Sequence, residues 1–244
     1  MSFKTFFKER EKKIKFLNKL KTAILDETHN DLKILKKSGV ESPHEIIKIL
    51  ISQGSQAYHT GDLYTFEYFI KSLFEIYQQP NNNIENHQIL DEINNFGLMS
   101  AHHHNNLPYN IILENYKEHL FMNAMTETFR QHLDILRNFA LISLYENYIS
   151  GVLGVVNVYK ALNIHFQDNK MPICKMYLKN AIINLIYSAE KFEKDDLKGQ
   201  ILPEIIDILG NEEKRTSVER IKESLNVDIQ DNTEVKEEPQ GFEK

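Results

Sequence analysis

The chain has 244 residues, of which 41% are hydrophobic and 26% are charged, a composition typical of a globular protein with a sizeable core. It contains only 9 Gly and 6 Pro, and alternating β-branched residues are hard to find, so we expect an all-α fold. The single cysteine, Cys174, excludes an internal disulfide and fits either a reducing compartment or a fold that is indifferent to redox conditions. No N-terminal stretch has the order of a signal peptide. We therefore expect a cytoplasmic protein.

The net charge of −6 is distributed unevenly along the chain. Residues 1–21 contain eight Lys/Arg and two acidic residues, whereas residues 211–244 contain six Lys/Arg and ten acidic residues. These two segments carry +6 and −4, which leaves −8 for the residues between them, so a basic arm precedes an acidic body. Because an acidic body repels phosphate groups, we do not expect a nucleic-acid partner.

The first 25 residues predict an amphipathic helix with a basic face. Apolar residues recur at a 4-3 spacing, and Arg10 and Lys21 complete the same seam. The helix can pack on the body with its lysines reaching into solvent, lie on a membrane surface, or pair with a partner helix. The candidate partner-binding residues of this seam are Phe3, Phe7, Arg10, Ile14 and Leu17.

Parts of the chain resemble one another at a period of 43 to 45 residues. The segments LDEINNFGLMSA (90–101) and LDILRNFALISL (133–144) share Leu, Asp, Asn, Phe, Leu and Ser at a shift of 43 residues. In a weaker third copy, Ser188 follows Ser143 by 45 residues, and in an earlier one Ala57 precedes Ala101 by 44 residues. Self-similarity at such a period is typical of stacked helix pairs.

This period and patterning resemble those of HEAT and armadillo α-solenoids, whereas a tetratricopeptide unit is shorter, at roughly 34 residues. The resemblance implies an all-α superhelix of stacked antiparallel helix pairs whose surface binds other proteins. No residue of a family motif carries over. We expect a basic helical arm (1–40), a helical-repeat domain (43–225) and a disordered acidic tail (226–244) that is poor in large apolar residues.

The longest weakly charged run, residues 138–159, holds Glu146 and Asn147 at its middle. Those residues are costly inside a bilayer, so the run predicts two buried helices that meet near Glu146. Residues 148–161 are almost free of charge and include Gly151 and Gly154, which allow close helix packing. We expect this helix to be the most buried of the array; the alternative is an apolar groove that is open to a partner.

The only histidine cluster is His102, His103 and His104. A metal site needs ligands that converge from several elements, and three consecutive residues at a helix end point in different directions. Histidine also suits a helix C-terminus, so these residues are weak candidates for a metal site. Cys174 has no His or Asp beside it and is expected to be a small buried side chain.

The sequence contains no phosphate-binding glycine loop, H-E-x-x-H, G-x-S-x-G or paired-cysteine motif. We therefore predict no catalytic residue and no cofactor. The expected function is that of a non-enzymatic adaptor that binds a protein or peptide along the repeat surface. The alternative is a peripheral membrane or assembly-associated protein attached through residues 1–25, and a third is a helical metal-dependent enzyme that uses the histidine cluster.

Overall fold

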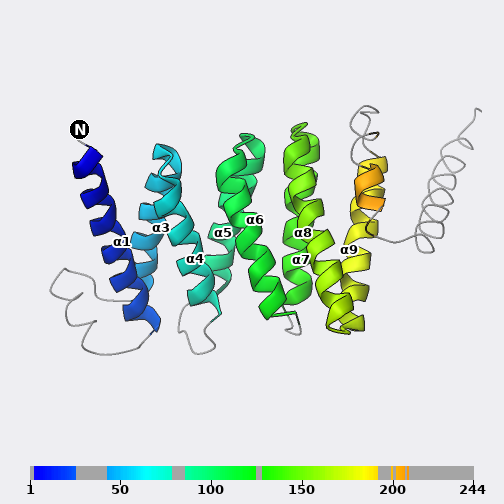
Figure 1. The fold of residues 1–244 in the computed structure, drawn as a ribbon, viewed down its shortest axis with the longest axis horizontal. Coiled ribbons are helices and arrows are strands. Elements are labelled where there is room, and N and C mark those ends of the chain that lie inside the picture. The colour runs from blue at the N-terminus through cyan, green and yellow to red at the C-terminus, as the bar shows by residue number, and fades with distance from the viewer. Residues whose placement is uncertain are drawn as a thin grey trace, which may run out of the picture.

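A computed structural model describes residues 3–25, 43–78, 86–124 and 128–191, together with residues 199, 202–206 and 208. Within these residues the chain is helical and contains no strand, so the expected all-α fold is confirmed. Residues 202–206 form a further short helical segment. The helices, with the labels of Figure 1, are α1 (Phe3–Leu25), α3 (Pro43–Thr60), α4 (Leu63–Tyr77), α5 (Asn86–His102), α6 (Asn106–Met122), α7 (Phe129–Tyr145), α8 (Ile149–Asp168) and α9 (Pro172–Glu190).

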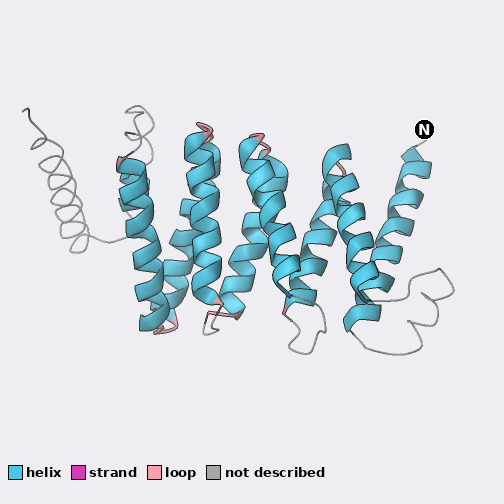
Figure 2. Ribbon diagram, turned by 180° about the vertical axis from the view of Figure 1, so that it is seen from behind, coloured by secondary structure: helices cyan, strands magenta, loops and turns pink. Residues whose placement is uncertain are grey.

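The helices pack against their neighbours in two rows. Helices α4, α6 and α8 contact one another in succession, and so do α5, α7 and α9. Chain neighbours also contact each other across the rows, as α3 does with α4, α5 with α6 and α7 with α8. Figure 1 views the row of α4, α6 and α8, and Figure 2 views the molecule from the other side. Helix α1 lies at one end of the array and α9 lies near the other.

The three turns that join α3 to α4, α5 to α6 and α7 to α8 close with the same backbone hydrogen bond. A backbone N–H donates to the carbonyl oxygen five residues earlier, which is the pattern of a Schellman helix end. Each of these bonds lies 43 residues after the previous one. The bonds run from Asp62 to Ala57 (2.9 Å), from Asn105 to Ser100 (2.8 Å) and from Tyr148 to Ser143 (2.7 Å).

The residue before each donor adopts a left-handed backbone conformation. Gly61 has φ of 70°, His104 has φ of 52° and Asn147 has φ of 59°. Glycine adopts this conformation without strain, and asparagine tolerates it better than most residues. The turns fix the register of the first pair: Ala57 corresponds to Ser100, so the sequence alignment of Ala57 with Ala101 was wrong by one residue.

Burial follows the same 43-residue period through α5 and α7. The two aligned segments agree in which side chains face the core and which face solvent. Leu98 and Leu141 are both half-buried, as their alignment implies. The equivalent buried pairs include Leu90 with Leu133, Ile93 with Leu136, Phe96 with Phe139 and Ser100 with Ser143, and Asn95 and Asn138 are both exposed.

The third copy is displaced relative to the alignment based on Ser188. Ser143 is fully buried, whereas Ser188 is half-buried and its hydroxyl donates to the backbone oxygen of Asn184 at 2.9 Å. The burial pattern of α7 instead recurs in α9 at a shift of 46 residues, which places Asn184 opposite Asn138. The 45-residue match of the two serines was therefore wrong as a structural equivalence.

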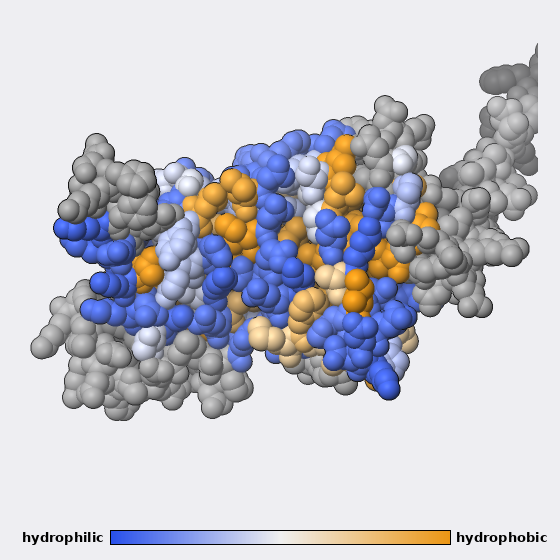
Figure 3. All heavy atoms as spheres, in the orientation of Figure 1, coloured by the Kyte–Doolittle hydropathy of each residue, from blue (hydrophilic) through white to orange (hydrophobic). Residues whose placement is uncertain are grey.

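Helix α7 ends at Tyr145 and α8 begins at Ile149, which confirms two helices meeting near Glu146. No helix in the described parts of the chain is long and apolar enough to cross a membrane. Helix α8 contacts α6, α7 and α9, and Val155 and Tyr159 are fully buried. Its outer side remains partly open, since Ile164 is 61% exposed, and Figure 3 shows apolar surface over this helix.

The predicted acidic tail (226–244) and the segments 26–40 and 211–225 lie outside the described residues. The side chains of Phe3, Phe7 and Arg10 also lie outside the described part of the chain, although α1 itself includes these positions.

Candidate interaction surfaces

The predicted seam of α1 faces the body of the protein where its side chains are described. Leu17 is 1% exposed and Ile14 packs against the core, with α3 and α4 as the neighbouring helices. The Lys21 Nζ lies 2.7 Å from Glu75 Oε2, and the hydroxyl of Tyr68 donates to Asn18 at 2.8 Å. Ile14 and Leu17 therefore contribute to the core of this chain.

The three consecutive histidines lie at the turn between α5 and α6, where they contact the turn between α7 and α8. His102 Nδ1 lies 2.6 Å from Glu146 Oε1, and His104 Nε2 lies 2.9 Å from the Glu146 backbone oxygen. The His104 ring stacks on Tyr148 with 5.0 Å between centroids. Among the described residues no group of three His, Cys, Asp or Glu side chains is placed to hold a metal. These contacts give His102 and His104 a role in joining neighbouring turns.

A buried pair of histidines lies between α6 and α7. His119 is 3% exposed and His132 is fully buried, and their rings meet edge to face with 4.7 Å between centroids. His119 Nδ1 lies 2.9 Å from Gln78 Nε2. Within the described residues, His119 Nε2 and both ring nitrogens of His132 have no hydrogen-bond partner. The two rings have therefore lost contact with water without gaining a hydrogen bond at every nitrogen.

Desolvation keeps both rings neutral near pH 7. Burial lowers the pKa of His119 to about 4. Burial, together with a smaller contribution from His119, lowers the pKa of His132 to about 3. A cleft of ≈ 290 Å³ between α4 and α6 borders His119. Because His119 Nδ1 contacts Gln78 and the other three nitrogens are buried, the arrangement suits a structural element better than a general base.

Asparagine occupies the same surface position on three adjacent helices. Asn95 of α5, Asn138 of α7 and Asn184 of α9 are all exposed, and we call these residues the asparagine row. Helix α7 contacts both α5 and α9, so the three amides lie on one continuous face. No hydrogen bond of the three amide side chains is found within the described part of the chain.

Half-buried apolar side chains accompany the asparagine row. Leu98, Leu141 and Tyr187 stand three residues after the three asparagines, on the same side of their helices. All three are partly accessible to solvent. Each helix of this row therefore presents an exposed amide next to a half-buried apolar side chain. The sequence held a signal for this surface, since Asn95 and Asn138 coincide in the 43-residue alignment.

Cys174 is 1% exposed, and its Sγ donates to the backbone oxygen of Ala124 at 3.1 Å. Burial raises the pKa of the thiol, which disfavours the reactive thiolate. The expectation of a small buried side chain is confirmed.

No family model matches the chain, and neither a curated protein nor a solved structure is significantly similar to it. The class of protein is therefore defined by the fold alone, as an all-helical protein of packed neighbouring helices.

Proposed function

We propose that the protein is a non-enzymatic cytoplasmic adaptor, built of HEAT-like stacked helix pairs, that binds a protein or peptide along the asparagine row. The observation that carries this proposal is the recurrence of an exposed asparagine on α5, α7 and α9. The equal turns at Gly61, His104 and Asn147 support the stacking of like helix pairs.

Exposed asparagine in the middle of a helix is a costly choice for a purely structural surface. Asparagine is less favourable than alanine in a helix interior by up to about 0.7 kcal/mol. Each amide offers one acceptor and two donor hydrogens, which suit the main-chain N–H and C=O groups of a bound segment. The half-buried Leu98, Leu141 and Tyr187 add apolar contact area beside the amides.

The test compares two sets of alanine variants in binding to a partner isolated from the native host. The triple variant Asn95→Ala, Asn138→Ala, Asn184→Ala should lose affinity by at least about tenfold, because three amide contacts disappear together. The matched control, Asn110→Ala with Asn157→Ala, changes exposed asparagines of α6 and α8 on the other row. Equal affinities of both variants and the wild type would exclude the asparagine row as the binding face.

Attachment to a membrane through residues 1–25 is less well supported. An amphipathic helix binds a bilayer through its apolar face, and Leu17 of that face is 1% exposed in the packed chain. Flotation with neutral and anionic vesicles, with and without residues 1–25, separates this alternative from the adaptor. A helical metal-dependent enzyme has the least support, because His102 and His104 are engaged with Glu146.

A further inference from the structure

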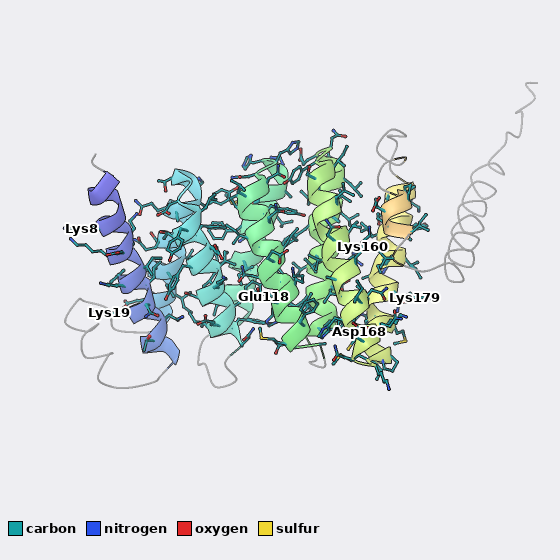
Figure 4. All side chains as sticks on the ribbon, in the orientation of Figure 1. Lys8, Lys19, Glu118, Lys160, Asp168 and Lys179 are labelled. Atoms are coloured by element: carbon teal, nitrogen blue, oxygen red, sulfur yellow. The ribbon has the colours of Figure 1, made fainter. Side chains whose placement is uncertain are left out.

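The outer side of α1 carries a line of lysines. Lys8, Lys12, Lys15 and Lys19 are all exposed, and we call them the lysine stripe. Their 4-3-4 spacing places them along one side of the helix. Leu17, on the other side, is buried against the body. Figure 4 shows Lys8 and Lys19 directed away from the neighbouring helices.

The stripe keeps an excess of positive charge: Glu11 is the only acidic residue of α1 whose side chain is described, and it stands three residues after Lys8 and four before Lys15. None of the four lysines forms an ion pair within the described residues, whereas Lys21 pairs with Glu75 and Lys71 pairs with Glu67. Helix α1 contacts only α3 and α4 closely, and it lies at the end of the array, so its outer side has no packed neighbour among the described helices. A polar cap would explain why this side of α1 is exposed, but four lysines beside a single glutamate leave a net positive charge, and that charge favours an anionic occupant.

An anionic segment occurs in the same chain. Residues 226–244 contain six acidic residues and two lysines. Four of the carboxylates are those of Asp228, Asp231, Glu234 and Glu238. The segment and the lysine stripe are therefore complementary in charge.

The two complementary elements belong to opposite ends of the molecule. Helix α1 lies at one end of the array, and residues 202–206 and 208, the last that the structure describes before the acidic segment, lie at the other end beside α9. Contact between the acidic segment of one copy and the lysine stripe of a second copy is then head-to-tail. Such a heterologous contact produces a ring or an open chain of subunits.

We propose that residues 226–244 of one copy dock on the lysine stripe of a second copy and so join the protein head-to-tail. Lysine ammonium groups donate to Asp and Glu carboxylates in this contact. Exposed ion pairs are individually weak and are screened by salt, so the association is reversible and strong only at low ionic strength. The contact uses neither the asparagine row nor the core, so it is independent of the adaptor function.

Sedimentation equilibrium of the full chain tests the proposal. At about 20 mM salt the weight-average mass should rise with protein concentration, and at about 500 mM salt it should return to that of a monomer. Reversing the stripe with Lys8→Glu, Lys12→Glu, Lys15→Glu and Lys19→Glu should abolish the rise. All four side chains are exposed, so the variant should retain the helical circular dichroism of the wild type.

The decisive experiment mixes two reversed proteins. A tail variant with Asp228→Lys, Asp231→Lys, Glu234→Lys and Glu238→Lys should also be monomeric by itself. Mixed with the stripe variant it should associate again, because each negative element then meets a positive one on the other protein. The matched control, Lys48→Glu with Lys170→Glu, removes two other exposed lysines and should leave self-association unchanged.

Three results would overturn the proposal. The first is a monomer at every concentration in low salt, and the second is a mixture of the reversed variants that stays monomeric. The third is a wild-type protein that stays monomeric but binds vesicles containing phosphatidylserine, while the stripe variant does not bind them. That result would assign the stripe to a membrane surface instead.

Discussion

The ring of Phe139 in α7 lies directly against Gly97 of α5, in the space that a side chain at residue 97 would need. A Cβ atom added at Gly97 would lie 2.2 Å from Cζ of the Phe139 ring, which is fully buried. The substitution Gly97→Ala should therefore force the ring to move and destabilise the protein by about 1–3 kcal/mol in chemical denaturation. Asn95→Ala on the same helix is the control and should stabilise it slightly, since its side chain is exposed.

A second substitution at the partner residue checks the cause. Phe139→Leu shortens the side chain that meets the new methyl group, so the double variant Gly97→Ala, Phe139→Leu should be less destabilised than the sum of the single variants. A coupling of about 0.5–3 kcal/mol is expected for residues in contact. Strictly additive effects would show that the methyl group at residue 97 is accommodated without the ring.

Phe96 and Phe139 should be equivalent in energy as well as in position. Phe96 packs near Tyr58 and Phe66 with ring centroids 5.7 and 5.5 Å away. Phe96→Ala and Phe139→Ala should each cost about 3–5 kcal/mol in the free energy of unfolding. Phe16→Ala is the matched control, because that ring is 42% exposed and its loss should change stability by less than about 0.5 kcal/mol. A tolerated alanine at either core position would contradict the repeat.

The buried histidines predict a loss of stability in weak acid. The pKa of His119 is lowered to about 4 and that of His132 to about 3, whereas both titrate near 6.5 in the unfolded chain. Between these values the unfolded state binds more protons, so the free energy of unfolding falls as the pH falls. The slope is about 1.4 kcal/mol per pH unit for each histidine, and stability is complete above about pH 6.5.

Denaturation midpoints measured from pH 7.5 to pH 4.5 check this prediction. His132→Leu removes one titrating group and two nitrogens that lack partners among the described residues, so its stability should fall roughly half as steeply on acidification. Asn95→Ala changes an exposed residue that does not titrate and should leave the pH profile unchanged. A profile of His132→Leu identical to that of the wild type would assign the acid sensitivity to other groups.

Gly154 tests how tightly α8 is held by α6. A Cβ atom there would lie 2.7 Å from Cδ1 of Leu113, with the next contacts at 3.7 and 3.9 Å. Gly154→Leu should overpack this contact and destabilise the fold by about 1–3 kcal/mol. Asn157→Leu, one turn later on the exposed side, should have little effect on the denaturation midpoint. If Gly154→Leu leaves the midpoint unchanged while weakening partner binding, the outer side of α8 is the better candidate surface.

The sequence predicted the fold where identical residues recur in α5 and α7. The coincidence of Phe96 with Phe139 and of Ser100 with Ser143 is repeated in their burial. The alignment of α3 with α5 was displaced by one residue, because few residues of the two helices are identical. The hydrogen bond from Asp62 to Ala57 fixes the register of α3. The alignment of α9 with α7 was displaced because it was based on a single pair of serines, Ser143 and Ser188. The burial of the two helices shows the correct shift of 46 residues.

The surfaces were less accessible to sequence reasoning. The alignment contained Asn95 and Asn138, but whether a shared residue is buried or exposed depends on the neighbouring helix and not on its own segment. The same holds for His119 and His132, which lie 13 residues apart and meet only because α6 and α7 turn back on each other. The seam of α1 was recognised, yet its covering by α3 and α4 required the packed chain.

The equal turns at Gly61, His104 and Asn147 have a consequence for how such a chain can change in length. A genetic deletion that joins Gly61 directly to Asn105 removes residues 62–104, which are 43 residues, and leaves the same backbone turn between α3 and α6. Unequal recombination between copies can therefore shorten or extend the molecule in whole units without altering a helix end. The fit of side chains between newly adjacent helices, and not the path of the backbone, then decides which lengths fold.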